Sequence, residues 1–148
     1  MKQSIIILTL AATANAAPPH PPVDVNDRNL CAAVLIAEAG GEGRAGMQAV
    51  WEVVWSRAES RRWPSTPALV VKQRKQFSCL NGVKYGQLIA KAQRHPMWRH
   101  AWGITGAPPV TQMTKQANHY HAVSVRPYWA DADAFTVQVG NHKFYRLP

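Results

Sequence analysis

Apolar residues recur at helical spacing in the first third of the chain. One set is Leu30, Ala33, Val34 and Ala37. Their spacing of three and four residues places them on one face of an α-helix, which we expect over 28–39. Asn26 and Asp27 precede this stretch and are good N-cap residues. Gly40-Gly41 follows it, and glycine ends helices readily because it tolerates the left-handed conformation.

A second apolar stripe follows directly. It consists of Met47, Val50, Trp51, Val54 and Trp55. The stripe predicts a helix from near Gly46 to about Ser60, with Pro64 beyond its end. From 62 to 86 the pattern is mixed, and we expect a loop, one helical turn and a tight turn at Asn81-Gly82.

Two shorter helices are expected in the middle of the chain. Residues 85–95 have helical character until Pro96, which disfavours helix in the residue before it. A short helix is also expected across 108–117.

The last third changes character. Residues 119–123, 135–139 and 142–146 are rich in β-branched and aromatic side chains, and Gly140-Asn141 is a turn signal between the last two stretches. We therefore expect an α+β fold in a single domain, with a helical lobe followed by a small antiparallel β-rich lobe.

Composition narrows the class of partner. The chain has 148 residues, of which 47% are hydrophobic and 17% charged, so it is apolar enough to fold as one domain. Lys and Arg together number 17 against 8 Asp and Glu, which gives a net charge of +9. Such a balance favours a polyanionic partner: nucleic acid, anionic lipid or the acidic bacterial envelope.

The first residues indicate export. A short positive start, an apolar stretch at 4–13 and the small residues of Ala14-Asn15-Ala16 form the layout of a secretory signal peptide over 1–16. The alternative is an uncleaved N-terminal anchor, although the stretch is short for a bilayer span, which needs about 20 residues. We expect a proline-rich linker at 17–27 and the folded domain at 28–148.

The segment 37–43 carries the strongest chemical signal. It places Glu38 in the last turn of the first helix and Glu42 in a glycine-rich loop. The negative end of a helix dipole and partial burial both disfavour an ionised carboxyl, so Glu38 would hold a proton. Glycosidic cleavage needs such a proton for the leaving oxygen. The alternative is a structural Glu bonded to a nearby backbone amide.

Several segments follow one another in a recognisable order. They are Glu38-Ala39-Gly40-Gly41-Glu42-Gly43, Gly46, Trp63-Pro64, Gln76-Phe77-Ser78, His119-Tyr120-His121, Arg126-Pro127-Tyr128-Trp129 and Gly140-Asn141-His142-Lys143-Phe144-Tyr145. In this order and at this spacing, the set resembles the SleB/CwlJ family of cell-wall hydrolases over about 30–146. The chain departs from the family pattern at Gly40, where the family has Arg, and at Ser56, where it has Asn.

The resemblance implies a lysozyme-like fold, in which a helical lobe with the catalytic Glu faces a small β-rich lobe across a groove. It also implies cleavage of the MurNAc–GlcNAc bond of peptidoglycan without a cofactor. The family commonly acts as a lytic transglycosylase that leaves 1,6-anhydro ends. One carboxyl can then serve first as acid and afterwards as base.

By residue matching, Glu38 is expected to be catalytic. Supporting roles are expected for Glu42, Gln76, Tyr120 and His142. Trp129 and Phe77 match positions at the substrate groove, although packing in the core is an equally good interpretation for most of these residues and the better one for Phe77.

Other enzyme classes stay open at this point. Cys79 could be the nucleophile of an amidase or peptidase, with His121 or His142 as its base. A disulfide between Cys31 and Cys79 would exclude that chemistry. A zinc site would need His142 to approach His119 and His121, but no zinc-binding motif supports it, and we expect no metal.

A non-catalytic module that binds peptidoglycan is the remaining alternative. Basic residues at 72–75 and 61–62 would then form a solvated face that holds the acidic wall. No nucleic-acid motif is present, so we expect peptidoglycan rather than nucleic acid as the partner. We further expect a monomer in the periplasm or cell wall, without a stable membrane span once the leader is removed.

Overall fold

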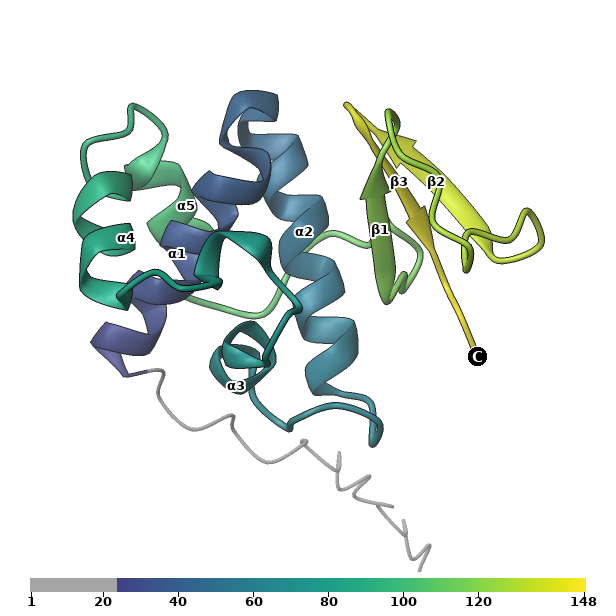
Figure 1. Cartoon of the computed structure of the whole chain (residues 1–148), viewed down its shortest axis with the longest axis horizontal. Coiled ribbons are helices and arrows are strands. Elements are labelled where there is room, and N and C mark those ends of the chain that lie inside the picture. The colour runs from purple at the N-terminus through teal and green to yellow at the C-terminus, as the bar shows by residue number, and fades with distance from the viewer. Residues whose placement is uncertain (1–23) are drawn as a thin grey trace, which may run out of the picture.

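A computed structural model describes residues 24–148, in which a helical lobe precedes a small β-sheet (Figure 1). Its helices are α1 (Val25–Ala39), α2 (Gly43–Ala58), α3 (Pro67–Lys72), α4 (Tyr85–Ala92) and α5 (Trp98–Ile104), with short 3₁₀ turns η1 (Gly40–Glu42) and η2 (Ser78–Leu80). Its strands are β1 (His119–Ala122), β2 (Phe135–Val139) and β3 (His142–Tyr145). The α+β class is therefore confirmed. The expected leader and most of the expected linker lie outside the described residues.

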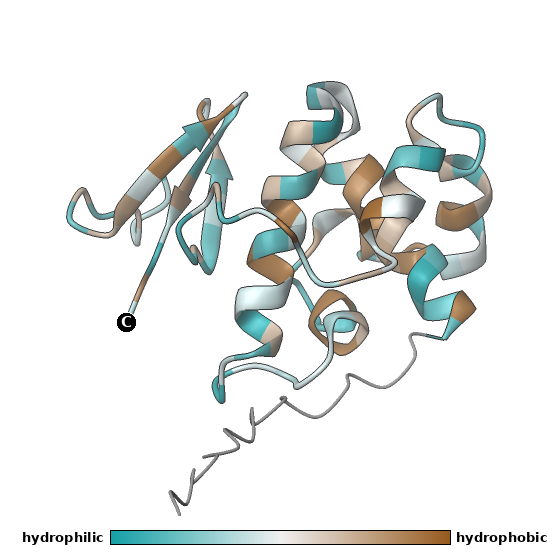
Figure 2. Ribbon diagram, turned by 180° about the vertical axis from the view of Figure 1, so that it is seen from behind, coloured by the Kyte–Doolittle hydropathy of each residue, from teal (hydrophilic) through white to brown (hydrophobic). Residues whose placement is uncertain are grey.

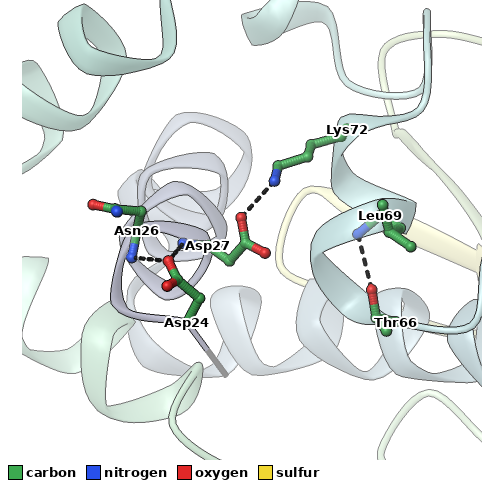
Figure 3. A network of polar contacts seen from close by, with 6 residues as sticks. All are labelled: Asp24, Asn26, Asp27, Thr66, Leu69 and Lys72. Carbon is green, nitrogen blue, oxygen red and sulfur yellow. Dashed lines mark hydrogen bonds and ion pairs between the residues drawn. The ribbon is translucent and has the colours of Figure 1, made fainter. Parts of the chain in front are cut away.

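Helix α1 begins earlier than the sequence predicts. Its N-cap is Asp24, whose Oδ1 accepts hydrogen bonds from the backbone N–H of Asn26 at 2.8 Å and of Asp27 at 3.3 Å (Figure 3). Asn26 and Asp27 are thus first-turn residues, and their assignment as caps is wrong. A carboxylate one turn earlier satisfies the free amides equally well.

Helix α3 is joined to α1 by an ion pair. The Lys72 ammonium lies 2.5 Å from Asp27 Oδ1 (Figure 3). At the other end of α3, Thr66 is the N-cap, and its Oγ1 accepts from the N–H of Leu69 at 3.3 Å. Figure 2 shows that α3 is largely hydrophobic, and its Ala68, Val70 and Val71 are buried against the neighbouring helices.

The connection from α1 to α2 differs in detail from the prediction. Gly40 keeps a right-handed helical conformation with φ −60°, and the chain continues into η1. The left-handed residue is Gly43, with φ +69°. Helix α2 begins there, three residues before Gly46.

The helix expected across 108–117 does not form. Instead the loop is held by the buried carboxylate of Glu52 on α2. That group accepts from Thr111 Oγ1 at 2.6 Å, from Met113 N at 3.1 Å, and from Thr114 N and Oγ1 at 2.7 and 2.6 Å. The backbone N–H groups of Met113 and Thr114, which a helix would bond internally, donate to the Glu52 side chain instead. Helix α5 forms upstream of this loop, where the sequence predicts no helix.

The three strands form an antiparallel sheet in the order β1-β3-β2, with Tyr120 opposite Phe144. Strand β2 has the predicted bounds, whereas β1 and β3 each end one residue before the predicted end. Gly140 has φ +54° in the turn before β3. Figure 1 shows α2 between α1 and the sheet. Ala49 and Val53 of α2 pack against Phe144, so one face of the sheet is turned toward the helical lobe.

Strand alternation sends neighbouring side chains to opposite faces. Tyr120, His142 and Phe144 share the face toward α2, whereas His119, His121 and Tyr145 share the other.

In the described part of the chain, no helix has both the length and the apolar character that a membrane span requires.

Candidate active site

The carboxyl group of Glu38 lies where the two lobes meet. Glu38 is in the last turn of α1 and is half-buried. The Tyr120 hydroxyl, from β1, donates a hydrogen bond to Glu38 Oε2 at 3.0 Å. The Cys79 thiol, from η2, forms a second side-chain hydrogen bond to the same carboxyl. Three distant parts of the chain therefore converge on one acid.

Tyr120 is fixed by its aromatic neighbours. Its ring stacks on Phe144, with centroids 5.6 Å apart and planes at 26°, and meets the His142 ring edge-on at 5.3 Å. Burial, followed by the charge of Glu38 and the hydrogen bond to it, raises the pKa of Tyr120 well above its usual range. The hydroxyl therefore stays protonated at neutral pH and acts as a donor to Glu38.

Glu42 and His142 form a second pair beside Tyr120. Glu42 Oε1 lies 2.8 Å from His142 Nδ1, and the two side chains are only 12% and 11% exposed. Two glycines make room for Glu42. A Cβ at Gly46 would lie 2.6 Å from Glu42 Cβ, and one at Gly140 would lie 2.5 Å from Glu42 Oε2. Gly46 and Gly140 come from two separate motifs, and the lack of a side chain at each leaves the space that Glu42 occupies.

Gln76 is exposed and contacts a buried cation. Its Oε1 accepts from Arg57 Nη1 at 3.1 Å, and Arg57 Nε donates to the backbone oxygen of Asn118 at 2.7 Å. Arg57 therefore ties the Gln76 loop to the residue that precedes β1. The sequence predicts no role for Arg57, and its place directly after Ser56, where the chain departs from the family pattern, is the one signal that could have found it.

A family model described as cell wall hydrolase matches residues 41–145, which is well over half of the chain. The chain belongs to this family. Glu38 lies three residues before the matched span, so its role is argued from the contacts above. A comparison with curated proteins finds no match.

Solved structures agree with this cell wall hydrolase in fold. One is the catalytic domain of the germination-specific lytic transglycosylase SleB from Bacillus anthracis, with a TM-score of 0.65 and 21% identity over 88% of this chain and 100% of that chain. Another is the catalytic domain of the Bacillus cereus SleB protein, with a TM-score of 0.61 and 23% identity over 86% of this chain and 94% of that one. The expected lysozyme-like fold is confirmed.

Two residues expected at the groove of this cell wall hydrolase pack against other side chains of the chain. Phe77 is 1% exposed and belongs to the helical core. Trp129 packs against His119, His121 and Tyr145, with ring centroids 5.1, 5.7 and 5.6 Å away. Those three side chains occupy the face of the sheet opposite Tyr120. The groove assignment of Phe77 is therefore wrong, and core packing, the better interpretation of this residue, is confirmed. Trp129 is half-buried, and its role at the groove stays a prediction.

The two cysteines are free thiols, so the disulfide that the sequence left open is not formed. Burial, then the charge of Glu38 and the hydrogen bond to it, raise the pKa of Cys79 to about 12. A thiol that stays protonated is a poor nucleophile. The histidines considered as its base have other partners, since His142 contacts Glu42 and His121 Nε2 lies 3.0 Å from the Tyr145 hydroxyl.

The histidines do not assemble into the zinc site that was considered. His119 and His121 share one face of β1, as expected, but His142 is on the face that carries Tyr120. Within 24–148, no three His, Cys, Asp or Glu side chains are grouped as a metal ion would require. The polar group at the candidate site is instead the Glu38 carboxyl, with hydrogen bonds from the Tyr120 hydroxyl and the Cys79 thiol.

Proposed function

We propose that this cell wall hydrolase cleaves the MurNAc–GlcNAc bond of peptidoglycan with Glu38 as its acid and base. The observation that carries the proposal is the position of the Glu38 carboxyl, half-buried where the lobes meet and bonded to the Tyr120 hydroxyl. Membership of the cell wall hydrolase family supports the substrate class. The similarity to a structure described as a lytic transglycosylase supports the type of reaction.

The chemistry requires one carboxyl. Protonated Glu38 gives its proton to the glycosidic oxygen as the bond from that oxygen to C1 of MurNAc breaks. The 6-hydroxyl of the same MurNAc then attacks C1, and its proton passes to the Glu38 carboxylate. The products are a free GlcNAc hydroxyl and a 1,6-anhydro-MurNAc end. No water is consumed, and Glu38 regains its proton.

The neighbouring residues would position this acid. Tyr120 holds Oε2, which orients the other carboxyl oxygen for proton transfer. The His142 ring contacts the Tyr120 ring edge-on, and Glu42 holds His142 in that position. Gln76 is exposed beside this region, and an amide suits hydrogen bonding to sugar hydroxyl or acetyl groups.

The same proposal includes the place of action. A cell-wall substrate requires export, so we assign 1–16 as a secretory leader and the periplasm or cell wall as the location. We further propose that the exported domain works as a monomer.

Digestion of purified sacculi by wild type and by Glu38→Gln tests the mechanism, with mass spectrometry of the released fragments. Gln keeps an acceptor for Tyr120 but has no proton to donate. We expect anhydro-muropeptides from wild type and at least about a hundredfold less product from the variant. Glu59→Gln, at an exposed site after α2, is the matched control and should be fully active.

Three outcomes would contradict the proposal. Full activity of Glu38→Gln would remove the assigned acid. Reducing MurNAc ends would show that water, not the 6-hydroxyl, attacks C1. Stem peptides released without cleavage of the glycan would indicate an amidase.

A further inference from the structure

A basic cavity of about 630 Å³ lies between α3 and the start of α4. Its lining includes Lys72, Arg74, Lys75, Leu80 and Tyr85, and none of its lining residues is acidic. Tyr85 is 42% exposed and offers an aromatic ring at the edge. The cavity is therefore suited to a ligand with negative charge and some apolar surface.

Two of its three cations are not engaged in ion pairs. Lys72 contacts Asp27. Arg74 and Lys75 are exposed, and among residues 24–148 neither lies within ion-pair distance of an acidic side chain. An unpaired Arg beside an unpaired Lys is a good receptor for a carboxylate, since the guanidinium can donate two parallel hydrogen bonds and the ammonium adds a point charge.

The backbone holds these cations in a strained loop. Lys75 has φ +64°, in the left-handed region that a lysine rarely adopts. The loop is fixed on both sides by Val71 and Phe77, each 1% exposed, and by the bond from Arg57 to Gln76. Strain that the surrounding structure maintains is often found at binding sites.

The cavity lies toward the start of α1, where its Lys72 contacts Asp27, and Glu38 lies at the end of the same helix. The η2 turn connects the two places, because Leu80 lines the cavity and the residue before it, Cys79, forms the hydrogen bond to Glu38. Eleven residues of helix, about 16 Å, separate Asp27 from Glu38, a distance that an extended peptide of about five residues spans. Each MurNAc of a glycan strand carries a short acidic peptide.

We propose that this cavity binds carboxylates of the stem peptide, so that the enzyme prefers glycan that still carries its peptides. The inference rests on the proposed function. Arg74 and Lys75 would hold a carboxylate, and Tyr85 would contact the aliphatic part of the peptide. The two cations act on recognition of the substrate and not on the proton transfer.

The test compares two substrates: soluble glycan strands with stem peptides, and the same strands after an amidase has removed them. Amidase treatment leaves the lactyl carboxylate on MurNAc, so the stripped strand keeps a negative charge at each unit. For Arg74→Gln/Lys75→Gln, we expect KM on stem-bearing strands to rise about tenfold with kcat retained. On stripped strands the double variant should match wild type, which also shows that it is folded.

The matched control is Lys91→Gln/Arg94→Gln, which removes two exposed positive charges elsewhere. It should behave like wild type on both strands. An equal rise of KM on both substrates, an equal effect of the control, or wild-type behaviour of Arg74→Gln/Lys75→Gln would each overturn the inference. Failure of wild type to cleave either strand would instead contradict the proposed function.

Discussion

Tyr120 and Tyr145 are the same residue on paired strands, but the pleat of the sheet sends them to opposite faces. Tyr120 bonds the Glu38 carboxyl, and Tyr145 bonds His121 in the aromatic packing around Trp129. The difference between a residue of the site and a packing residue is thus a matter of strand register. Side-chain chemistry alone does not separate them.

The two tyrosines make a matched pair of variants. Tyr120→Phe removes the donor to Glu38 and keeps the stacked ring, so we expect the rate on sacculi to fall about tenfold, as for the loss of one positioning hydrogen bond of about 1.4 kcal/mol. Tyr145→Phe removes the hydroxyl that contacts His121 on the far face and should stay near wild type in rate. Circular dichroism checks that both fold. An equal loss of rate in the two variants would show that the Tyr120 hydroxyl has no special role.

At the residue scale, a local pattern in the sequence predicts the role of Glu38, which ends an apolar helix and begins a family motif. In the structure its carboxyl contacts Tyr120 and Cys79, and its role as the acid stays a prediction. The sequence does not predict the contact of Cys79 with Glu38 or the contacts of Arg57, because they join segments far apart in the chain. Aromatic character alone also does not predict that Phe77 lies in the helical core or that Trp129 packs on the sheet face away from Tyr120.

Among the elements, α1, α2, α4 and the three strands followed from periodicity and turn residues. Helix α5 did not, because its seven residues are too few for the helical spacing of Trp98, Ala101 and Trp102 to decide the element. The failed helix at 108–117 has a different cause. Pro108-Pro109 cannot donate backbone hydrogen bonds, and the donors that follow are bonded to Glu52. The Glu52 side chain on α2 thus fixes the conformation of the loop that connects the two lobes.

Glu52 offers an element-scale test. The Glu52→Gln variant replaces one of two acceptor oxygens by an NH₂ group, which faces the Thr114 or Thr111 donors. Because buried donors lose their acceptor, we expect the free energy of unfolding to fall by about 2–4 kcal/mol in urea titration. Glu59→Gln, an exposed acid just after the same helix, should change it by less than about 0.5 kcal/mol. A neutral Glu52→Gln would show that the loop keeps its conformation without this acid.

At the scale of the whole molecule, α2 contributes side chains to the cores of both lobes. Its Met47, Val50 and Trp51 belong to the helical core, and its Ala49 and Val53 complete the core beneath Phe144. A three-stranded sheet of this size is marginal unless a helix covers it. Glu38 comes from α1 on one side of α2, and Tyr120 comes from the sheet on the other side. The hydrogen bond between them therefore forms only while both lobes stay packed on α2.

Native-state hydrogen exchange tests this dependence. If the sheet cannot persist without α2, the slowest amides of β3 and of α2 should exchange with the same free energy of opening, within about 1 kcal/mol, because only global unfolding exposes them. Val53→Ala, at a fully buried position, should lower both values together, whereas Val110→Ala, at a position 90% exposed, should lower neither. Exchange of β3 at a much lower free energy than α2 would mean that the sheet opens on its own. Tyr120 would then leave Glu38 during each opening, and the hydrogen bond between them would form only part of the time.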